Sequence, residues 1–258
     1  MQLFTNVLVW HFFAILIAKY ASTSPFKERV PLDVDTSCEP VHGIGVVRSE
    51  QFPGARYYYV RTTFAVKYRI GLVAHGNQIL LPGNDLDFYR IVFYRPWADG
   101  RRYVRVVTKT LGPGYRGFRV VYEFYKGKDD QRFKYIYRTC VDLDLLDQEE
   151  NHIIKIDDMG SGAKRFHVQS EKCTELKICV VKYGRYTLDK EIEGLIDRNV
   201  IWEGGILYPT ITIISRYNNG TCVATKYKYA GIEDGFVLVS RQESEIFLGP
   251  SDEKIVVK

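Results

Sequence analysis

The chain has 258 residues, of which 46% are hydrophobic and 26% are charged, and its formal net charge is +5. This is the composition of an ordinary folded protein with enough apolar side chains for a core, and it excludes a disordered or low-complexity chain. Nineteen Tyr and fourteen Phe favour β-strands, because aromatic side chains pack well on a pleated, half-buried surface.

Residues 1–24 are predicted to be a signal peptide. An apolar run from Phe12 to Ala18 is too short to span a bilayer, and small residues follow from Ala21 to Ser24. The preceding residues depart from the pattern, since they contain no Lys or Arg, and a buried N-terminal helix or strand is one alternative. A retained signal anchor is another, because Lys19-Tyr20 makes the cleavage region imperfect. We expect a secreted, soluble chain with no membrane span after signal removal, because no later segment has the length and apolar character of one.

Runs that alternate between apolar and polar residues dominate the rest of the chain and predict antiparallel strands. Turn residues rich in Gly, Asn and Asp separate these runs. The clearest runs are 57–68, 90–94, 103–107, 117–125, 176–181, 210–214, 222–227 and 235–239.

An internal repeat is predicted, because five short segments of the first half recur in the same order in the second. The pairs are Asp33–Asp35 with Asp142–Asp144, Tyr59–Val60 with His167–Val168, Asn77–Leu80 with Asn199–Trp202, the turn at Asp99–Gly100 with the turn at Asn219–Gly220, and Gly117–Val121 with Gly235–Val239. We therefore expect an all-β protein made of two small antiparallel, sandwich-like units, 30–139 and 140–245, followed by a polar tail at 246–258. A single β-barrel is the alternative.

One segment of the second half carries a family resemblance. Residues 194–203 have the sequence Gly-Leu-Ile-Asp-Arg-Asn-Val-Ile-Trp-Glu, which resembles the core of the FAINT domain, a module frequently associated in Theileria and found in secreted piroplasm proteins. The resemblance covers most of residues 30–245 as two copies and is specific around Ile201-Trp202, whereas Leu80 stands at the matched position in the first copy. It implies a protein secreted by an intracellular parasite, often into the host cell, and it implies no particular chemistry.

Five cysteines follow the predicted signal peptide: Cys38, Cys140, Cys173, Cys179 and Cys222. In an oxidising compartment they predict two disulfides and one odd thiol, and their spacing leaves the connectivity open. None of them forms a CxxC pair, so we expect no zinc site.

Asn219-Gly220-Thr221 is an N-glycosylation sequon, so Asn219 is a candidate glycosylation site. Asn-Gly is also a strong hairpin signal, and a turn alone explains these residues.

No catalytic or metal-binding pattern is present. Asp33 and Asp35, like Asp142 and Asp144, are carboxylates two residues apart that would share one face of a strand, and a solvated face explains them. The four histidines after the signal segment are widely spaced. We expect a non-enzymatic protein without a metal or cofactor.

Charge is unevenly distributed between the two halves. Residues 41–141 hold 18 Lys and Arg against 7 Asp and Glu, whereas residues 142–258 hold 15 against 20. In the first half arginines are mixed with aromatic residues, and guanidinium groups suit planar recognition of phosphate, sulfate or carboxylate. The candidate binding residues are Arg95, Trp97, Arg101, Arg102, Arg105 and Arg116.

Two functions agree with these features. The first is a secreted effector or interaction protein that contacts a host protein or an anionic surface through the basic first unit; nucleic acid is not an expected partner of a secreted chain. The second is a lipocalin-like carrier of a small ligand, which needs one closed barrel with an internal cavity, whereas a binder has two filled cores. The sequence assigns neither a partner nor an oligomeric state.

Overall fold

The structure is a computed structural model, which describes residues 29–112, 117–147 and 151–245. The predicted signal peptide, Arg116 and the predicted tail at 246–258 lie outside these residues. Within the described part, secondary structure is almost entirely β, with one short 3-10 turn at Thr62–Phe64. The all-β prediction is therefore confirmed. No helix in this part is long and apolar enough to cross a membrane.

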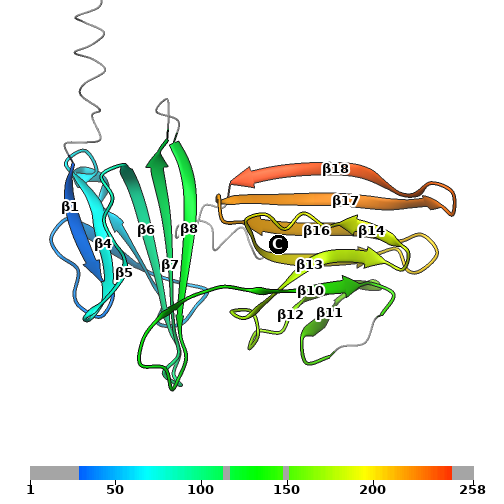
Figure 1. Ribbon diagram of the computed structural model, residues 1–258, viewed down its shortest axis with the longest axis horizontal. Coiled ribbons are helices and arrows are strands. Elements are labelled where there is room, and N and C mark those ends of the chain that lie inside the picture. Colours follow the sequence, from blue (N-terminus) through cyan, green and yellow to red (C-terminus); the bar gives the residue numbers. More distant parts are fainter. Residues whose placement is uncertain (1–28, 113–116, 148–150, 246–258) are drawn as a thin grey trace, which may run out of the picture.

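The first nine strands form two open sheets that pack face to face (Figure 1). The smaller sheet has the order β1-β4-β5 and the larger has the order β2-β3-β6-β7-β8-β9. The strands are β1 (Val30–Asp35), β2 (Ile44–Arg48), β3 (Arg56–Val60), β4 (Tyr68–His75), β5 (Gln78–Leu81), β6 (Asp87–Pro96), β7 (Arg102–Leu111), β8 (Gly117–Lys126) and β9 (Lys134–Tyr135).

The last nine strands repeat this arrangement, with a small sheet β10-β13-β14 and a large sheet β11-β12-β15-β16-β17-β18. The strands are β10 (Thr139–Asp144), β11 (Ile154–Gly160), β12 (Ala163–Val168), β13 (Leu176–Tyr183), β14 (Tyr186–Asp189), β15 (Leu195–Glu203), β16 (Thr210–Tyr217), β17 (Thr221–Gly231) and β18 (Gly235–Glu245). Each strand of the first unit thus has a counterpart nine strands later, so the two units share one topology.

The first strand of each unit departs from the antiparallel prediction in the same way. β1 pairs in parallel with β4 and its register shifts after Leu32, and β10 pairs in parallel with β13 with the same shift after Val141. All other strand pairs are antiparallel. A shared irregularity of this kind indicates duplication more strongly than strand count does, because bulges are specific local features.

The strand order corrects three of the five predicted repeat matches. The turn at Asp99–Gly100 joins β6 to β7, whose counterparts are β15 and β16, whereas Asn219–Gly220 lies between β16 and β17. Likewise Gly117 opens β8 and Gly235 opens β18, which is the counterpart of β9. The error has a simple cause: every hairpin shows the same two-residue alternation and similar turn residues, so a match by local pattern can slip by one strand.

The predicted match of Leu80 with Trp202 is displaced by one strand for the same reason. Trp202 lies on β15, and the counterpart strand in the first unit is β6, not β5, which contains Leu80. Trp202 follows the buried Arg198 by four residues, and Tyr94 follows the buried Arg90 on β6 by four residues. Tyr94, an aromatic residue that is also in the core, therefore occupies the equivalent position.

Each unit has its own filled core between its two sheets. In the first unit Tyr58 and Val92 are fully buried, and in the second Phe166 and Ile211 are. Both sheets of each unit end in edge strands, so none closes on itself. The alternative of a single β-barrel is wrong, and the lipocalin-like carrier loses the closed barrel on which it depended.

A buried arginine joins the two sheets of the first unit. From β6, Arg90 donates through Nη1 to the Gly71 carbonyl on β4 of the opposite sheet and through Nε to Thr108 Oγ1 at 3.2 Å. Its charge is balanced by Asp87 at 2.5 Å. A buried guanidinium requires this full set of acceptors, because an unpaired buried charge is strongly destabilising.

The second unit has an equivalent buried arginine between its two sheets. From β15, Arg198 donates through Nη1 to the Cys179 carbonyl on β13 and through Nε to Ser215 Oγ at 2.9 Å. Asp189 balances its charge at 3.0 Å, and the Arg198 side chain is completely buried. Arginine is usually an exposed residue, so the sequence did not predict that Arg90 and Arg198 are buried between the two sheets of their units.

One disulfide is present among the described residues, between Cys140 on β10 and Cys179 on β13, with the two Cα atoms 5.3 Å apart. Cys38, Cys173 and Cys222 are free. The prediction of two disulfides is therefore wrong: only the Cys140–Cys179 pair is brought together, by neighbouring strands of one small sheet. A disulfide is typical of an oxidising compartment.

Candidate functional site

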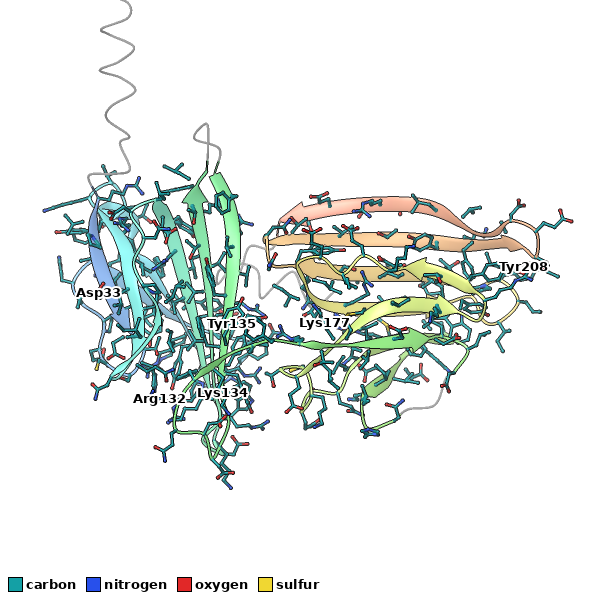
Figure 2. The ribbon with its side chains drawn as sticks, viewed as in Figure 1. Asp33, Arg132, Lys134, Tyr135, Lys177 and Tyr208 are labelled. Atoms are coloured by element: carbon teal, nitrogen blue, oxygen red, sulfur yellow. A yellow bond between two sulfur atoms is a disulfide. The ribbon has the colours of Figure 1, made fainter. Side chains whose placement is uncertain are left out.

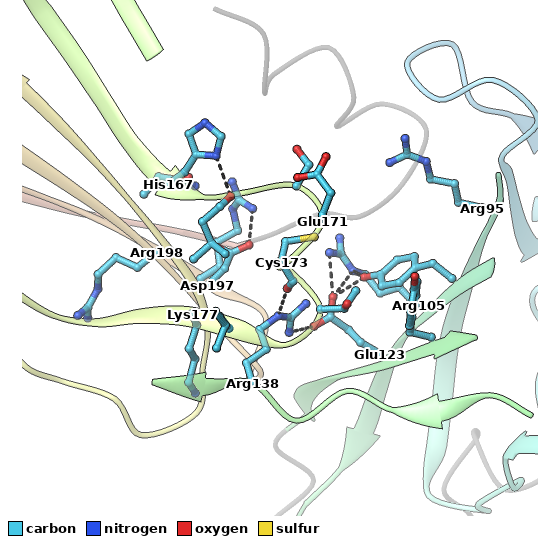
Figure 3. A pocket seen from close by; sticks show the side chains of 18 of the residues that line it. Arg95, Arg105, Glu123, Arg138, His167, Glu171, Cys173, Lys177, Asp197 and Arg198 are labelled. Carbon is cyan, nitrogen blue, oxygen red and sulfur yellow. Dashed lines mark hydrogen bonds and ion pairs between the residues drawn. The ribbon is translucent and has the colours of Figure 1, made fainter. Parts of the chain in front are cut away.

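A cleft of about 550 Å³ lies where the two units meet (Figure 3). In Figure 2, Lys177, which lines the cleft, lies on the side of the second unit that faces the first, whereas Tyr208 lies at the far end. The wall from the first unit comes mainly from β6, β7 and β8, and the other wall comes from β12, β13, β15, β16 and the loop between β12 and β13.

The second unit docks beside an exposed edge of the first. The strand β9 covers only the end of β8, where Phe124 and Tyr125 pair with it. Before that end, the β8 backbone N–H of Val121 donates to the carbonyl of Asn218, in the turn between β16 and β17, at 2.8 Å. The short β9 thus leaves backbone donors that the second unit satisfies, as an uncovered strand edge requires.

The segment between the units is bonded to the second unit at each successive residue. Arg138 Nε donates to the Cys173 carbonyl at 2.6 Å, and the Thr139 N–H donates to the Glu175 carbonyl at 2.8 Å. Cys140 follows with the disulfide. These contacts fix the position of the loop that forms the floor of the cleft.

Glu123 on β8 is the most enclosed acid of the cleft, with 5% of its side chain exposed. It accepts hydrogen bonds from the Tyr103 hydroxyl, from Arg105 Nη2 at 3.1 Å and from Arg138 Nη1 at 2.5 Å. Burial opposes ionisation of this carboxyl, but Arg105 and Arg138 outweigh it and lower the pKa of Glu123 to about 2. Burial and the neighbouring carboxylate raise the pKa of Tyr103 well above its usual value, so its hydroxyl stays protonated.

Aromatic rings support the arginines of the first wall. The guanidinium of Arg95 lies 4.2 Å from the centre of the Phe52 ring and 4.5 Å from that of Trp97. The guanidinium of Arg101 lies 5.5 Å from the centre of the Trp97 ring and is paired with Asp99 at 2.7 Å. Burial lowers the pKa of Arg95, and in the described residues no carboxylate forms an ion pair with it.

The second wall adds further basic groups. Lys177 Nζ donates to the Leu195 carbonyl at 2.6 Å, and burial together with the charges of Arg138 and Arg198 lowers the pKa of Lys177. Arg165 lines the cleft from β12, and no ion pair to it occurs among the described residues.

Two acidic residues accept hydrogen bonds from side chains of this wall. Asp157 accepts from His167 Nε2 at 2.8 Å, and Asp197 accepts from Arg216 Nη1 at 2.8 Å. The other oxygen of Asp197 is buried without a hydrogen-bond partner in the described part of the chain.

Positive charge prevails in the cleft. Among the described residues, three acids line it, Glu123, Glu171 and Asp197, and two more, Asp99 and Asp189, pair with its arginines from outside. Eight basic side chains of the same described part of the chain stand against these five acids and leave an excess of three positive charges. The eight are Arg95, Arg101, Arg105, Arg138, Arg165, Lys177, Arg198 and Arg216.

The structure gathers four of the six predicted binding residues into this cleft: Arg95, Trp97, Arg101 and Arg105. Arg102 is not among the lining residues, because alternation along β7 turns it to the other face of the sheet, where it donates to the Gly100 carbonyl at 3.0 Å. Arg116 lies outside the described residues.

Sequence reasoning missed half of the cleft. The second unit was considered acidic as a whole, yet it supplies Arg165, Lys177 and Arg216, and Arg138 comes from the connection between the units. A net charge over one hundred residues hides such a local cluster. The alternation of β12 and β13 could have placed Arg165 and Lys177 on defined strand faces, but no local pattern shows that these faces meet the first unit.

The remaining predicted sites have structural explanations. Asp35 Oδ1 accepts from the N–H groups of Ser37 and Gly76, and Asp144 Oδ1 accepts from the N–H of Gly184. These aspartates stabilise turns, and among the described residues no group of three or more His, Cys, Asp or Glu is arranged to hold a metal. Asn219 is exposed in the turn between β16 and β17, where its Oδ1 accepts from the Thr221 N–H.

Comparisons with protein-family models, with curated proteins and with solved structures found no match. The resemblance to the FAINT domain stays a prediction.

Proposed function

We propose that this protein is a non-enzymatic interaction protein that binds an anionic group of its partner in the cleft between the two units. The observation that carries the proposal is the excess of positive charge in an enclosed site built by both units. The proposal is narrower than the expectation of a secreted effector with a basic binding face. It locates the contact with the partner in a defined cleft rather than on one face of the first unit.

The charge states of the cleft favour binding over acid–base catalysis. A general base works best with a pKa near the working pH, whereas the pKa of Glu123 is about 2 and the hydroxyl of Tyr103 has a raised pKa. Neither group is therefore suited to act as a general base near neutral pH.

The arginines themselves favour an anion. Arg95 is stacked on two rings, so its position is held by packing while its N–H groups have no carboxylate partner among the described residues. A guanidinium that is partly removed from water gains most from an incoming anion, because charge-assisted hydrogen bonds strengthen in such surroundings.

The test is to measure binding of the full chain to immobilised heparin at fixed salt. The double variant Arg95→Gln, Arg165→Gln removes one charge from each wall and breaks no ion pair in the described structure. We expect at least a tenfold loss of affinity, because a hydrogen bond to a charged group contributes about 1.5–3 kcal/mol and 1.4 kcal/mol is tenfold.

The matched control is Arg48→Gln, Arg61→Gln, which removes the same charge from exposed positions of the first unit outside the cleft. We expect its affinity to change by less than threefold. Equal losses in the two double variants would mean that only net charge matters, and the proposed cleft function would be wrong.

A further inference from the structure

We infer that the ligand of the cleft is a compact molecule that carries two or more phosphate or sulfate groups and contacts both walls at once. This inference rests on the proposed function and adds the chemical class of the ligand. Four features of the cleft lead to it: its charge, its choice of basic residues, the aromatic support of its arginines and its fixed shape.

The charge of the cleft requires more than one anionic group. Among the described residues, eight basic groups stand against five acids and leave three positive charges. The basic groups without an ion pair in this part of the chain lie on both walls: Arg95 on one, and Arg165 and Lys177 on the other. A single carboxylate would neutralise one wall and leave like charges facing each other across the cleft. Two or three negative charges on one molecule neutralise both.

Of the three basic groups without an ion pair among the described residues, two are arginines, Arg95 and Arg165, and one is a lysine. Arginine presents parallel N–H donors that match two oxygens of a phosphate or a sulfate, whereas lysine acts as a point charge. This composition favours tetrahedral oxyanions, with several oxygens each, over scattered single charges.

Aromatic residues hold the arginines of the first wall in position. Trp97 and Tyr125 are half-buried with their ring centres 6.4 Å apart, edge to face. The guanidinium groups of Arg95 and Arg101 lie over the Trp97 ring, 4.5 and 5.5 Å from its centre. Because these cations are already positioned by packing on the ring, they can meet the anionic groups of a ligand with little rearrangement.

The cleft has the size and the rigidity for a small ligand. Its volume of about 550 Å³ is in the range of small-molecule sites, roughly 300–1,000 Å³. Figure 3 shows Arg138 between the walls, where it bonds to Glu123 of the first unit and to the Cys173 carbonyl of the second. A site whose walls are already bonded together loses little entropy when it binds a compact ligand.

The experiment is isothermal titration calorimetry of the full chain with four probes: inositol hexakisphosphate, a trisulfated heparin disaccharide, glucose 6-phosphate and citrate. We expect one or both of the first two to bind at least tenfold more tightly than glucose 6-phosphate, which has one phosphate, and than citrate, which has three carboxylates. Binding of only the first probe identifies phosphate as the natural group, and binding of only the second identifies sulfate.

Single variants test whether both walls take part. Arg95→Gln and Arg165→Gln should each weaken the tighter probe at least fivefold, and the control Arg48→Gln should leave its affinity unchanged. The inference is wrong if citrate binds as tightly as the best probe, or if only one of the two cleft variants has an effect.

The two proposals fail in different ways. If heparin binding depends on the cleft arginines but neither multiply charged probe binds, the compact ligand is ruled out and the proposed function stands. If heparin binding does not depend on the cleft arginines and no probe binds, both proposals are wrong.

Discussion

Replacement of Glu123 by Gln tests the electrostatic account of the cleft most directly. The change keeps the shape of the side chain and removes the charge that Arg105 and Arg138 share. The pKa of Glu123 falls from 4.5 to about 2 on folding. Because one pKa unit corresponds to about 1.4 kcal/mol, the ionised carboxylate stabilises the folded chain by about 3 kcal/mol at pH 7.

The pH dependence follows from the direction of this shift. A carboxyl whose pKa is lowered in the folded state stabilises fully above its unfolded pKa of 4.5, and this stabilisation is lost as the pH falls toward about 2. Linkage gives about 1 kcal/mol remaining at pH 3. We therefore expect the difference in unfolding free energy between the wild type and Glu123→Gln to shrink from about 3 kcal/mol at pH 7 to about 1 kcal/mol at pH 3.

The measurement is urea denaturation of both proteins at pH 7 and pH 3, followed by tryptophan fluorescence. Glu203→Gln is the matched control, since Glu203 is about half exposed and lies 3.9 Å from Lys226. Such a surface pair contributes about 0–1 kcal/mol. A loss below 1 kcal/mol for Glu123→Gln at pH 7, or the same loss at both pH values, would refute the reasoning.

Three further changes have defined outcomes. Cys140→Ser removes a disulfide that closes a loop of 39 residues, so urea denaturation should show a loss of about 4 kcal/mol in unfolding free energy on the chain-entropy account. Adding reductant to this variant should cause no further loss, whereas adding it to the wild type should reproduce the loss. Arg198→Met leaves the partly buried Asp189 without its ion pair and removes the donors to the Cys179 carbonyl and Ser215, so it should cost about 3–5 kcal/mol in the same assay; a cost below 1 kcal/mol would contradict its role between the sheets. Gly220→Ala places a methyl group against the Arg119 side chain at a positive φ of 78°, whereas Gly100→Ala has a φ of 95° and open space. Both should lower the melting temperature through backbone strain of about 1–3 kcal/mol, and the larger drop should belong to Gly220→Ala.

The sequence alone determined the β class of this protein and the existence of a basic, aromatic cluster on the first unit. Alternation and turn residues are local properties, so the strands around Val92 and Ile211 follow from their own neighbours. Arg95, Trp97 and Arg105 fall close together along the chain, and the hairpin that contains them necessarily brings them near one another.

The tertiary structure alone decided how distant segments meet. Local alternation is the same in every hairpin, so it could not show that β6 corresponds to β15, that Cys140 reaches Cys179, or that β1 and β10 pair in parallel. The cleft depends on one such long-range fact: β9 is too short to cover β8, and the second unit docks beside the uncovered edge. That docking brings Arg165 and Arg95 to the walls of one cleft, which the basic face of the first unit alone does not form.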